Sequence, residues 1–184
     1  MIYLVSGFSR SGTSMMMRCL AAGGLSAADD HQFDELNRIY GDETYQPNPN
    51  GFFMVAEYGE FMRPDFAEEY EGRLIKIPYE YILSLPHHSY RMVFMLRNPQ
   101  EIYKSMIRFM PQGFGIQETA TFFYDDVVGE LLNRISKRTD MDVHIAYYPE
   151  VVQQPLKFFG GLGWPIDAAC SSACVEPALY RMVI

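Results

Sequence analysis

The chain has 184 residues, a length that fits one domain, spanning residues 1–184, around a single hydrophobic core. Hydrophobic residues make up 48% of it and charged residues 21%, a composition typical of soluble globular proteins that excludes the disordered and collagen-like classes. The formal net charge of -8 argues against a chain that wraps nucleic acid or lies on an anionic membrane, so we expect neither partner.

The first seven residues are apolar, but Ser9 interrupts the run too early for a signal peptide or a membrane span. We therefore expect a cytoplasmic protein. Cys19, Cys170 and Cys174 have neither the number nor the spacing of a disulfide framework or a complete zinc site. We expect reduced thiols and no metal site.

The N-terminal third begins with a clear strand, loop and helix. Residues 2–6 form a short apolar run rich in β-formers, and residues 13–22 are rich in Met, Leu and Ala before two glycines. Residues 25–51 are polar and lack a clean period, and a turn rich in Pro, Asn and Gly closes this segment at residues 47–51. Such a segment often carries a substrate surface.

Two further strands are predicted in the middle of the chain, at residues 73–77 and 92–96. Their continuous hydrophobicity suits buried parallel strands. A helix follows the second strand, with Asn98 as its N-cap, Pro99 at its first position and Glu101 where a capping-box acid belongs.

The C-terminal third continues the alternation of helices and strands. Residues 119–138 predict a helix, residues 143–147 predict a strand, and residues 148–149 read as the exit from that strand. This order predicts an α/β fold with a mostly parallel central sheet flanked by helices, in which a ligand binds at the carboxyl ends of the strands.

A phosphate-binding loop is the strongest motif in the sequence. Gly7 and Gly12 have the spacing G-x-x-x-x-G between a predicted strand and a predicted helix. Glycines let the backbone bend around an anion, while free N–H groups at the helix start and the hydroxyls of Ser11, Thr13 and Ser14 can donate hydrogen bonds to it. The loop predicts a three-layer P-loop nucleotide-binding fold.

The positive charges near this loop are not those of a standard ATPase. Such an enzyme has Lys at position 13, where this chain has Thr13, and the charge here is supplied by Arg10. Arg97 follows the strand at residues 92–96, and Ser105 lies eight residues later on the next helix, so both could contact one phosphate.

The sequence resembles the sulfotransferase family, and its bacterial branch most closely. Members of that family bind the 5'-phosphosulfate of 3'-phosphoadenosine 5'-phosphosulfate on a loop of this kind and the 3'-phosphate through an Arg and a Ser at the spacing of Arg97 and Ser105. The matching motifs are Arg10-Ser11-Gly12-Thr13-Ser14, Arg97 with Ser105, Asn48-Pro49-Asn50-Gly51-Phe52-Phe53, Lys76 in Leu74-Ile75-Lys76, and Leu179-Tyr180-Arg181.

The resemblance implies sulfuryl transfer from 3'-phosphoadenosine 5'-phosphosulfate to a hydroxyl or amino group of a small-molecule or carbohydrate acceptor, without a metal ion. Arg10 is expected to stabilise the charge of the departing phosphate, and Lys76 could do so from the other side. The nucleotide would be bound by Arg10, Ser11, Gly12, Thr13, Ser14, Arg97 and Ser105.

The general base is less well defined. Cytosolic members of the family carry a histidine just after the strand that contains the Lys, and this sequence has Pro78 there. Acids and bases in plausible reach are Asp30, His31, Glu57 and Glu80, of which Glu57 and His31 are the favoured hypotheses.

Two other functions are compatible with the same motifs. A P-loop kinase acting on a small molecule would share the fold and the loop, although Thr13 in place of Lys weighs against it. A non-catalytic member of the fold would bind a nucleotide or a partner and transfer nothing.

Overall fold

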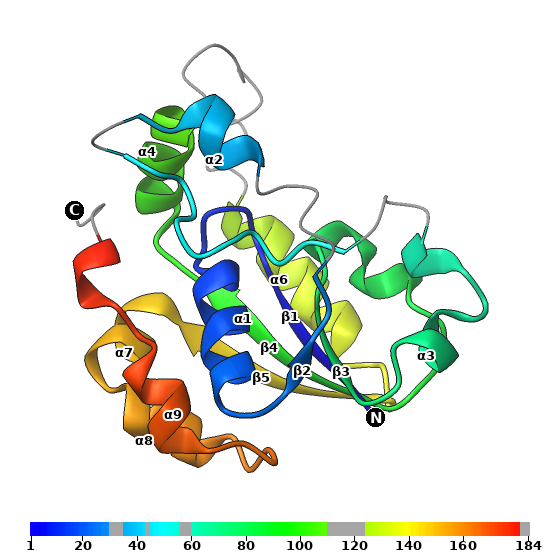
Figure 1. The fold of residues 1–184 in the computed structure, drawn as a ribbon. Coiled ribbons are helices and arrows are strands. Elements are labelled where there is room, and N and C mark those ends of the chain that lie inside the picture. The colour runs from blue at the N-terminus through cyan, green and yellow to red at the C-terminus, as the bar shows by residue number, and fades with distance from the viewer. Residues whose placement is uncertain (30–34, 43–44, 56–59, 110–123, 181–184) are drawn as a thin grey trace.

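The structure of the chain is a computed structural model (Figure 1), which describes residues 1–29, 35–42, 45–55, 60–109 and 124–180. Five parallel strands within these ranges form one sheet in the order β2-β3-β1-β4-β5. Since β1 pairs with both β3 and β4, the loop that follows β1 leaves the middle of the sheet. The strands are β1 (Ile2–Gly7), β2 (Ser26–Ala27), β3 (Arg73–Lys76), β4 (Tyr90–Leu96) and β5 (Met141–Tyr147).

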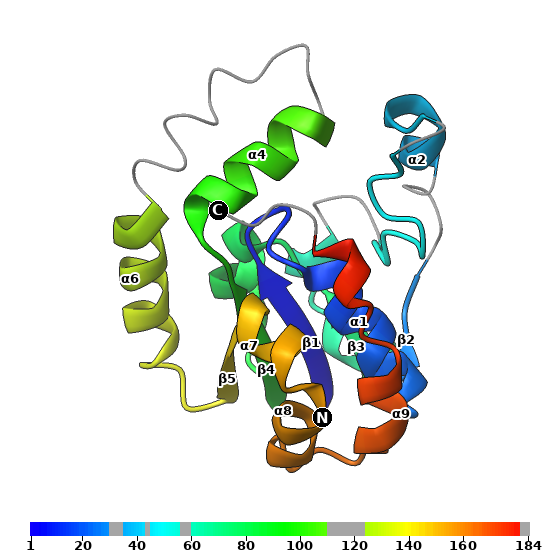
Figure 2. The ribbon, with the colours of Figure 1, turned by 90° about the vertical axis from the view of Figure 1, so that its left-hand side faces the viewer.

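Helices cover both faces of this sheet. Figure 2 shows α6 on one side of the strands, and α1 and α9 on the other. The bounds of the helices are α1 (Thr13–Ala22), α2 (Glu35–Tyr40), α3 (Phe66–Glu69), α4 (Pro99–Phe109), α6 (Tyr124–Ile135), α7 (Tyr148–Gln153), α8 (Pro155–Gly161) and α9 (Ala168–Ala173). Three 3-10 turns are η1 (Glu60–Met62), η2 (Tyr79–Ser84) and η3 (Pro177–Leu179).

The alternation of side chains along the strands divides the buried residues into two hydrophobic cores, one on each face of the sheet, where the length led us to expect a single core. Leu4 of β1 belongs to the core under α3 and α6, and the next residue, Val5, belongs to the core under α1, α7 and α8. Both side chains are fully buried, because a parallel sheet with helices on each face has no solvent-exposed side at its centre. The predicted α/β class and the parallel, helix-flanked sheet are therefore confirmed.

Most of the expected elements are present, with shifted ends. The helix expected at residues 13–22 has those bounds in α1, while β4 begins at Tyr90 and β3 ends at Lys76. The helix expected at residues 119–138 is described only as α6, and residues 119–123 lie outside the described residues.

Two segments differ from the sequence-based expectation. The expected strand exit at residues 148–149 is the start of helix α7, where proline suits the first turn because its missing N–H has no partner there. Residues 25–51, which showed no clean period, contain the two-residue strand β2 and the short helix α2. These elements are too short for their periodicity to be seen in sequence.

Cys19, Cys170 and Cys174 are not joined by disulfides in the structure, and burial raises the pKa of the Cys19 thiol to about 12. No helix in the described ranges combines the length and the apolar character that crossing a membrane requires.

An ion-pair cluster holds together the amino-terminal edge of the sheet, opposite to the loop after β1. Asp140 accepts hydrogen bonds from Arg138 at 2.9 and 2.6 Å and from the amide of His88 at 3.1 Å. The Arg138 guanidinium, helped by this amide, holds the pKa of Asp140 well below its ordinary value. Arg138 also donates to the carbonyls of Leu85 and Pro86, at 2.9 and 3.1 Å, so the cluster joins the segments that enter β4 and β5.

We expect Asp140→Asn to lower the free energy of unfolding at pH 7 by about 1–2 kcal/mol, the scale of lost charge-assisted hydrogen bonds. Because folding lowers the pKa of this carboxyl, its contribution is complete above the unfolded pKa of about 4 and is lost as the pH falls toward the folded pKa. Urea unfolding of both proteins at pH 7 and pH 3 should show the difference narrowing at pH 3. The exposed Asp125→Asn is the control, and an equal difference at both pH values would contradict the assignment.

Candidate functional site

The loop after β1 has a backbone that only glycine or a strained residue adopts. Gly7 and Gly12 have φ of 144° and 102°, and Arg10 between them has φ of 68°. A Cβ on Gly7 would lie 2.6 Å from the carbonyl oxygen of Met95, and one on Gly12 would lie 2.3 Å from the ring of Tyr148. The two glycines of the motif are therefore required by close packing as well as by backbone conformation.

The loop opens directly into α1, and the first turn of that helix has no side-chain cap. Gly12 is the N-cap residue, so backbone N–H groups at the helix start lack the side-chain acceptor that Ser, Thr, Asp or Asn would supply. Ser11, just before the cap, is fully buried, and its Oγ has no hydrogen-bond partner among the described residues. An unpartnered buried hydroxyl at a helix N-terminus is compatible with an anion ligand.

Arg97 lies at the carboxyl end of β4 and is only 9% exposed. Its Nε donates to Glu101 Oε2 at 2.8 Å, and its Nη1 donates to the carbonyl of Arg10 at 3.1 Å, which attaches β4 to the loop. The buried Nη2 has no hydrogen-bond partner among the described residues. A buried guanidinium with an unused donor is a candidate ligand for an anion.

The side chain of Glu101 does not form the expected capping box. Both of its oxygens are taken, by Arg97 and by the hydroxyl of Tyr180, which donates to Oε1 at 2.7 Å. Asn98 does cap α4 as expected, since its Oδ1 accepts from the amide of Gln100 at 2.8 Å. The spacing was right for a capping acid, but a buried arginine nearby is a stronger partner for a carboxylate than a backbone amide.

Ser105 is buried on α4 and contacts Arg10 rather than Arg97. Arg10 Nε donates to Ser105 Oγ at 3.0 Å, and Arg10 Nη2 donates to the carbonyl of Pro47 at 2.9 Å. The guanidinium also lies 5.1 Å from the ring centre of Phe109. Arg97 and Ser105 thus both contact Arg10, Arg97 through the carbonyl of Arg10 and Ser105 through its side chain.

Lys76 is the last residue of β3. It is buried, and its side chain reaches the first turn of α1. Its Nζ donates to Ser14 Oγ at 3.1 Å and to the carbonyl of Phe52. Ser14 itself donates to the same carbonyl at 3.3 Å. The structure therefore brings the predicted Lys76 to the loop, next to one of the predicted nucleotide-binding hydroxyls.

Residues 45–53 lie across the loop. This segment supplies the carbonyl of Pro47, which accepts from Arg10, and the carbonyl of Phe52, which accepts from Lys76. Asn48 attaches this segment to α2 through a reciprocal pair with Asn37, at 2.6 and 2.9 Å. Gly51 and Phe53 have φ of 93° and 53°, which turns the chain so that the carbonyl between them, that of Phe52, meets Lys76. Phe53 is a residue in a conformation that glycine adopts more readily, and its strain is held by these contacts.

Of the predicted bases, Glu80 alone lies in the described part of the chain. His31 and Glu57, the two favoured hypotheses, lie outside the described residues, as does Asp30. Glu80 is exposed at the start of η2. His87 and His88 lie at the opposite edge of the sheet, beside Asp140 and Glu71, at 3.2 and 2.6 Å.

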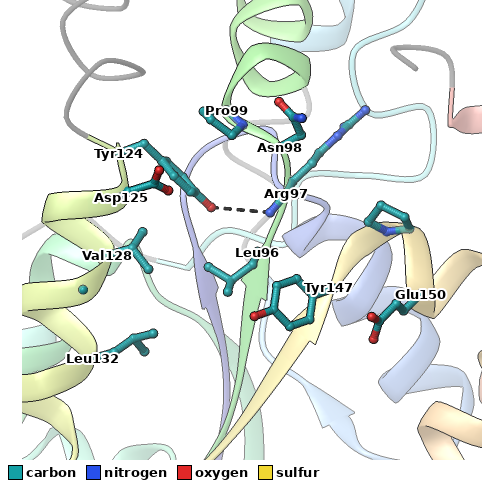
Figure 3. Close-up of a pocket in the computed structure, with 12 residues that line it drawn as sticks. Leu96, Arg97, Asn98, Pro99, Tyr124, Asp125, Val128, Leu132, Tyr147 and Glu150 are labelled. Atoms are coloured by element: carbon teal, nitrogen blue, oxygen red, sulfur yellow. Dashed lines mark hydrogen bonds between the residues drawn. The ribbon is translucent and has the colours of Figure 1, made fainter. Parts of the chain in front are cut away.

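A cavity of about 590 Å³, which sequence reasoning did not find, lies beyond the ends of β4 and β5 (Figure 3). The hydroxyl of Tyr124 accepts from the amide of Arg97 at 3.4 Å in its wall, while the side chain of Arg97 leads away from it. Its size suits a small organic ligand. The lining residues are Leu96, Arg97, Asn98, Pro99, Tyr124, Asp125, Val128, Gly129, Leu132, Tyr147, Pro149 and Glu150.

Comparison with known families and proteins adds no identification. No family model matches the sequence, and no curated protein matches it. The interpretation of the site therefore depends on its own geometry and on the motifs described above.

We expect Gly12→Ala to destabilise the protein by about 1–3 kcal/mol, because the new Cβ would overlap the ring of Tyr148 in a backbone conformation that alanine avoids. Gly129→Ala is the matched control, since a Cβ on that residue of α6 meets nothing within 4 Å and alanine favours a helix interior. Urea unfolding should show a loss for the first variant and no loss for the second. Equal stabilities would mean that the loop can relax without the glycine.

Proposed function

We propose that this chain is a sulfotransferase that uses 3'-phosphoadenosine 5'-phosphosulfate as donor and a hydroxyl or amino group of a small-molecule or carbohydrate as acceptor. In this proposal the chain is a P-loop nucleotide-binding protein. The central position of β1 supports this, because the loop after it then lies between the carboxyl ends of β3 and β4, where ligands of open parallel sheets bind.

The observation that carries the proposal is the environment of Arg97. A buried guanidinium costs free energy unless its donors are used, and in the described part of the chain only Nε and Nη1 have partners, Glu101 and the carbonyl of Arg10. The spare Nη2 lies on a side chain that contacts the glycine loop, where the Oγ of Ser11 also has no hydrogen-bond partner among the described residues. A phosphate monoester would supply oxygens for such donors.

In this proposal, two groups of residues bind the nucleotide 3'-phosphoadenosine 5'-phosphosulfate. The 5'-phosphosulfate would be held by Ser11, Gly12, Thr13 and Ser14 at the start of α1. The 3'-phosphate would be held by Arg97 and Ser105. Ser105 can do this while it accepts from Arg10, because a hydroxyl that accepts a hydrogen bond keeps its own proton to donate.

Arg10 and Lys76 would serve the transfer itself. The bond from sulfur to the 5'-phosphate oxygen breaks as the acceptor oxygen or nitrogen bonds to sulfur, and negative charge develops on the departing bisphosphate. Lys76 is held against Ser14 at 3.1 Å and Arg10 belongs to the loop, so both cations would lie close to a phosphosulfate bound at the start of α1. His31 and Glu57 remain the hypotheses for the general base.

One observation favours a second candidate, a P-loop small-molecule kinase. Lys76 Nζ lies at the first turn of α1 and could replace the lysine that position 13 lacks. Such an enzyme would bind ATP with Mg²⁺ more tightly than a metal-free bisphosphate.

Calorimetry with adenosine 3',5'-bisphosphate, adenosine 5'-phosphate and Mg-ATP distinguishes these functions. We expect metal-free binding of the bisphosphate, at least about tenfold tighter than that of the 5'-phosphate, because a charge-assisted contact to the 3'-phosphate is worth about 1.5–3 kcal/mol. Tighter binding of Mg-ATP would instead support the kinase. If the bisphosphate binds, transfer of labelled sulfate to a panel of hydroxyl and amino acceptors separates an enzyme from a non-catalytic member.

Arg97→Ala should weaken binding of the bisphosphate by about 1.5–3 kcal/mol, and Ser14→Ala should weaken it less, since Ser14 contributes a neutral hydroxyl. Arg97→Lys keeps the charge but loses the planar fork, so an intermediate loss is expected. Thermal unfolding of each variant shows whether the fold is intact. Equal affinities of wild type and all three variants would reject this site.

A further inference from the structure

Glu101 is a buried carboxylate that links Arg97 to a distant part of the chain. It is 4% exposed, and its two oxygens accept from Arg97 Nε at 2.8 Å and from the Tyr180 hydroxyl at 2.7 Å. Burial and the contact with Glu101 raise the pKa of Tyr180 to about 12, so this hydroxyl keeps its proton and donates at neutral pH.

Two aromatic rings complete the surroundings of Arg97. Its guanidinium carbon lies 4.6 Å from the ring centre of Tyr148 and 5.3 Å from that of Tyr180. The two rings are 5.1 Å apart and almost perpendicular, with an interplanar angle of 81°. Together with the contacts of Nε and Nη1, these rings fix the plane of the guanidinium, and Nη2 is its remaining donor nitrogen.

We propose that Glu101 and Tyr180 are positioning residues for Arg97, and that they hold its guanidinium so that Nη2 meets a phosphate monoester bound beside the loop. This inference rests on the proposed function, because it concerns the group that would bind the 3'-phosphate. Neither residue contacts the ligand; both act through Arg97. The C-terminal turn η3, which ends next to Tyr180, is thereby part of the anion site.

Removal of the Glu101 charge would change the affinity for a phosphate in opposite directions, depending on whether Glu101 positions Arg97 or only repels the ligand. A carboxylate close to a bound phosphate repels it, so a Glu101 that did nothing else would weaken binding, and removing its charge would tighten binding. A Glu101 that positions Arg97 has the opposite effect, because a guanidinium free to rotate loses the orientation that bidentate or aligned hydrogen bonds need. The two roles predict opposite changes in affinity.

The first experiment compares Glu101→Gln with wild type by calorimetry, using adenosine 3',5'-bisphosphate and adenosine 5'-phosphate as probes. We expect the affinity for the bisphosphate to fall by about fivefold or more, and that for the 5'-phosphate to change by less than about twofold. Glu130→Gln, an exposed position on α6 with the same change of charge, is the matched control. Thermal unfolding of all variants shows whether they are folded.

The second experiment keeps the charge of Glu101 and removes only its second partner. Tyr180→Phe deletes the hydroxyl but keeps the ring over Arg97, and we expect about a two- to fourfold loss that is again confined to the bisphosphate. Tyr3→Phe, on β1 near the amino-terminal edge of the sheet, is the control for loss of a tyrosine hydroxyl.

A double-mutant cycle with Arg97→Met shows whether Glu101 acts through Arg97. In that background Glu101→Gln should no longer change the preference for the bisphosphate over the 5'-phosphate, since the positioned group is absent. The inference is overturned if Glu101→Gln tightens or does not alter bisphosphate binding, or if Tyr180→Phe behaves like Tyr3→Phe. A wild-type protein that does not discriminate between the two nucleotides would instead reject the proposed function.

Discussion

The pairing of β1 with β4 is the constraint on which the candidate site depends. Their parallel register places Gly7 opposite Met95, so the first residue of the glycine loop lies beside the end of β4, two residues before Arg97. A Cβ at position 7 would overlap the carbonyl oxygen of Met95, so a residue other than glycine could not pack this closely against β4. Because both strands run in the same direction, the loop and Arg97 emerge at one edge, and the bond from Arg97 to the Arg10 carbonyl joins them.

This edge concentrates positive charge in a chain whose overall charge is negative. Arg10, Lys76 and Arg97 lie within one set of contacts around the loop, where the carboxylate of Glu101 pairs with Arg97, while the whole chain carries a formal charge of -8. Burial of Lys76 and Arg97 is costly, and among the described residues the carbonyl of Phe52 and the ion pair with Glu101 contribute to offsetting it. The local field at the loop, rather than the net charge, determines which ligands the site favours.

The loop and the helix after it can be predicted from the sequence because both are local patterns. The glycine spacing and the Met-rich run after it fix α1 at its observed bounds, and Arg97 was found from its place after an apolar strand. The sequence predicts a helix-capping role for Glu101 because it shows only near neighbours. The second partner of this carboxylate, Tyr180, lies 79 residues away. The cavity beyond β4 and β5 was missed for the same reason, since its walls come from three separate parts of the chain.

The segment across the loop bears on how an anion could reach these cations. The carbonyls of Pro47 and Phe52 accept from Arg10 and Lys76, so neutral oxygens already lie where charged donors are directed. A phosphate or sulfate oxygen is a stronger acceptor for a cation than a carbonyl, and in a partly buried site the difference is larger than in water. An anion bound at the loop would therefore compete with the carbonyls of Pro47 and Phe52 for donors of Arg10 and Lys76. If the loop binds an anion as proposed, its affinity would be reduced by the free energy of the contacts that the anion replaces.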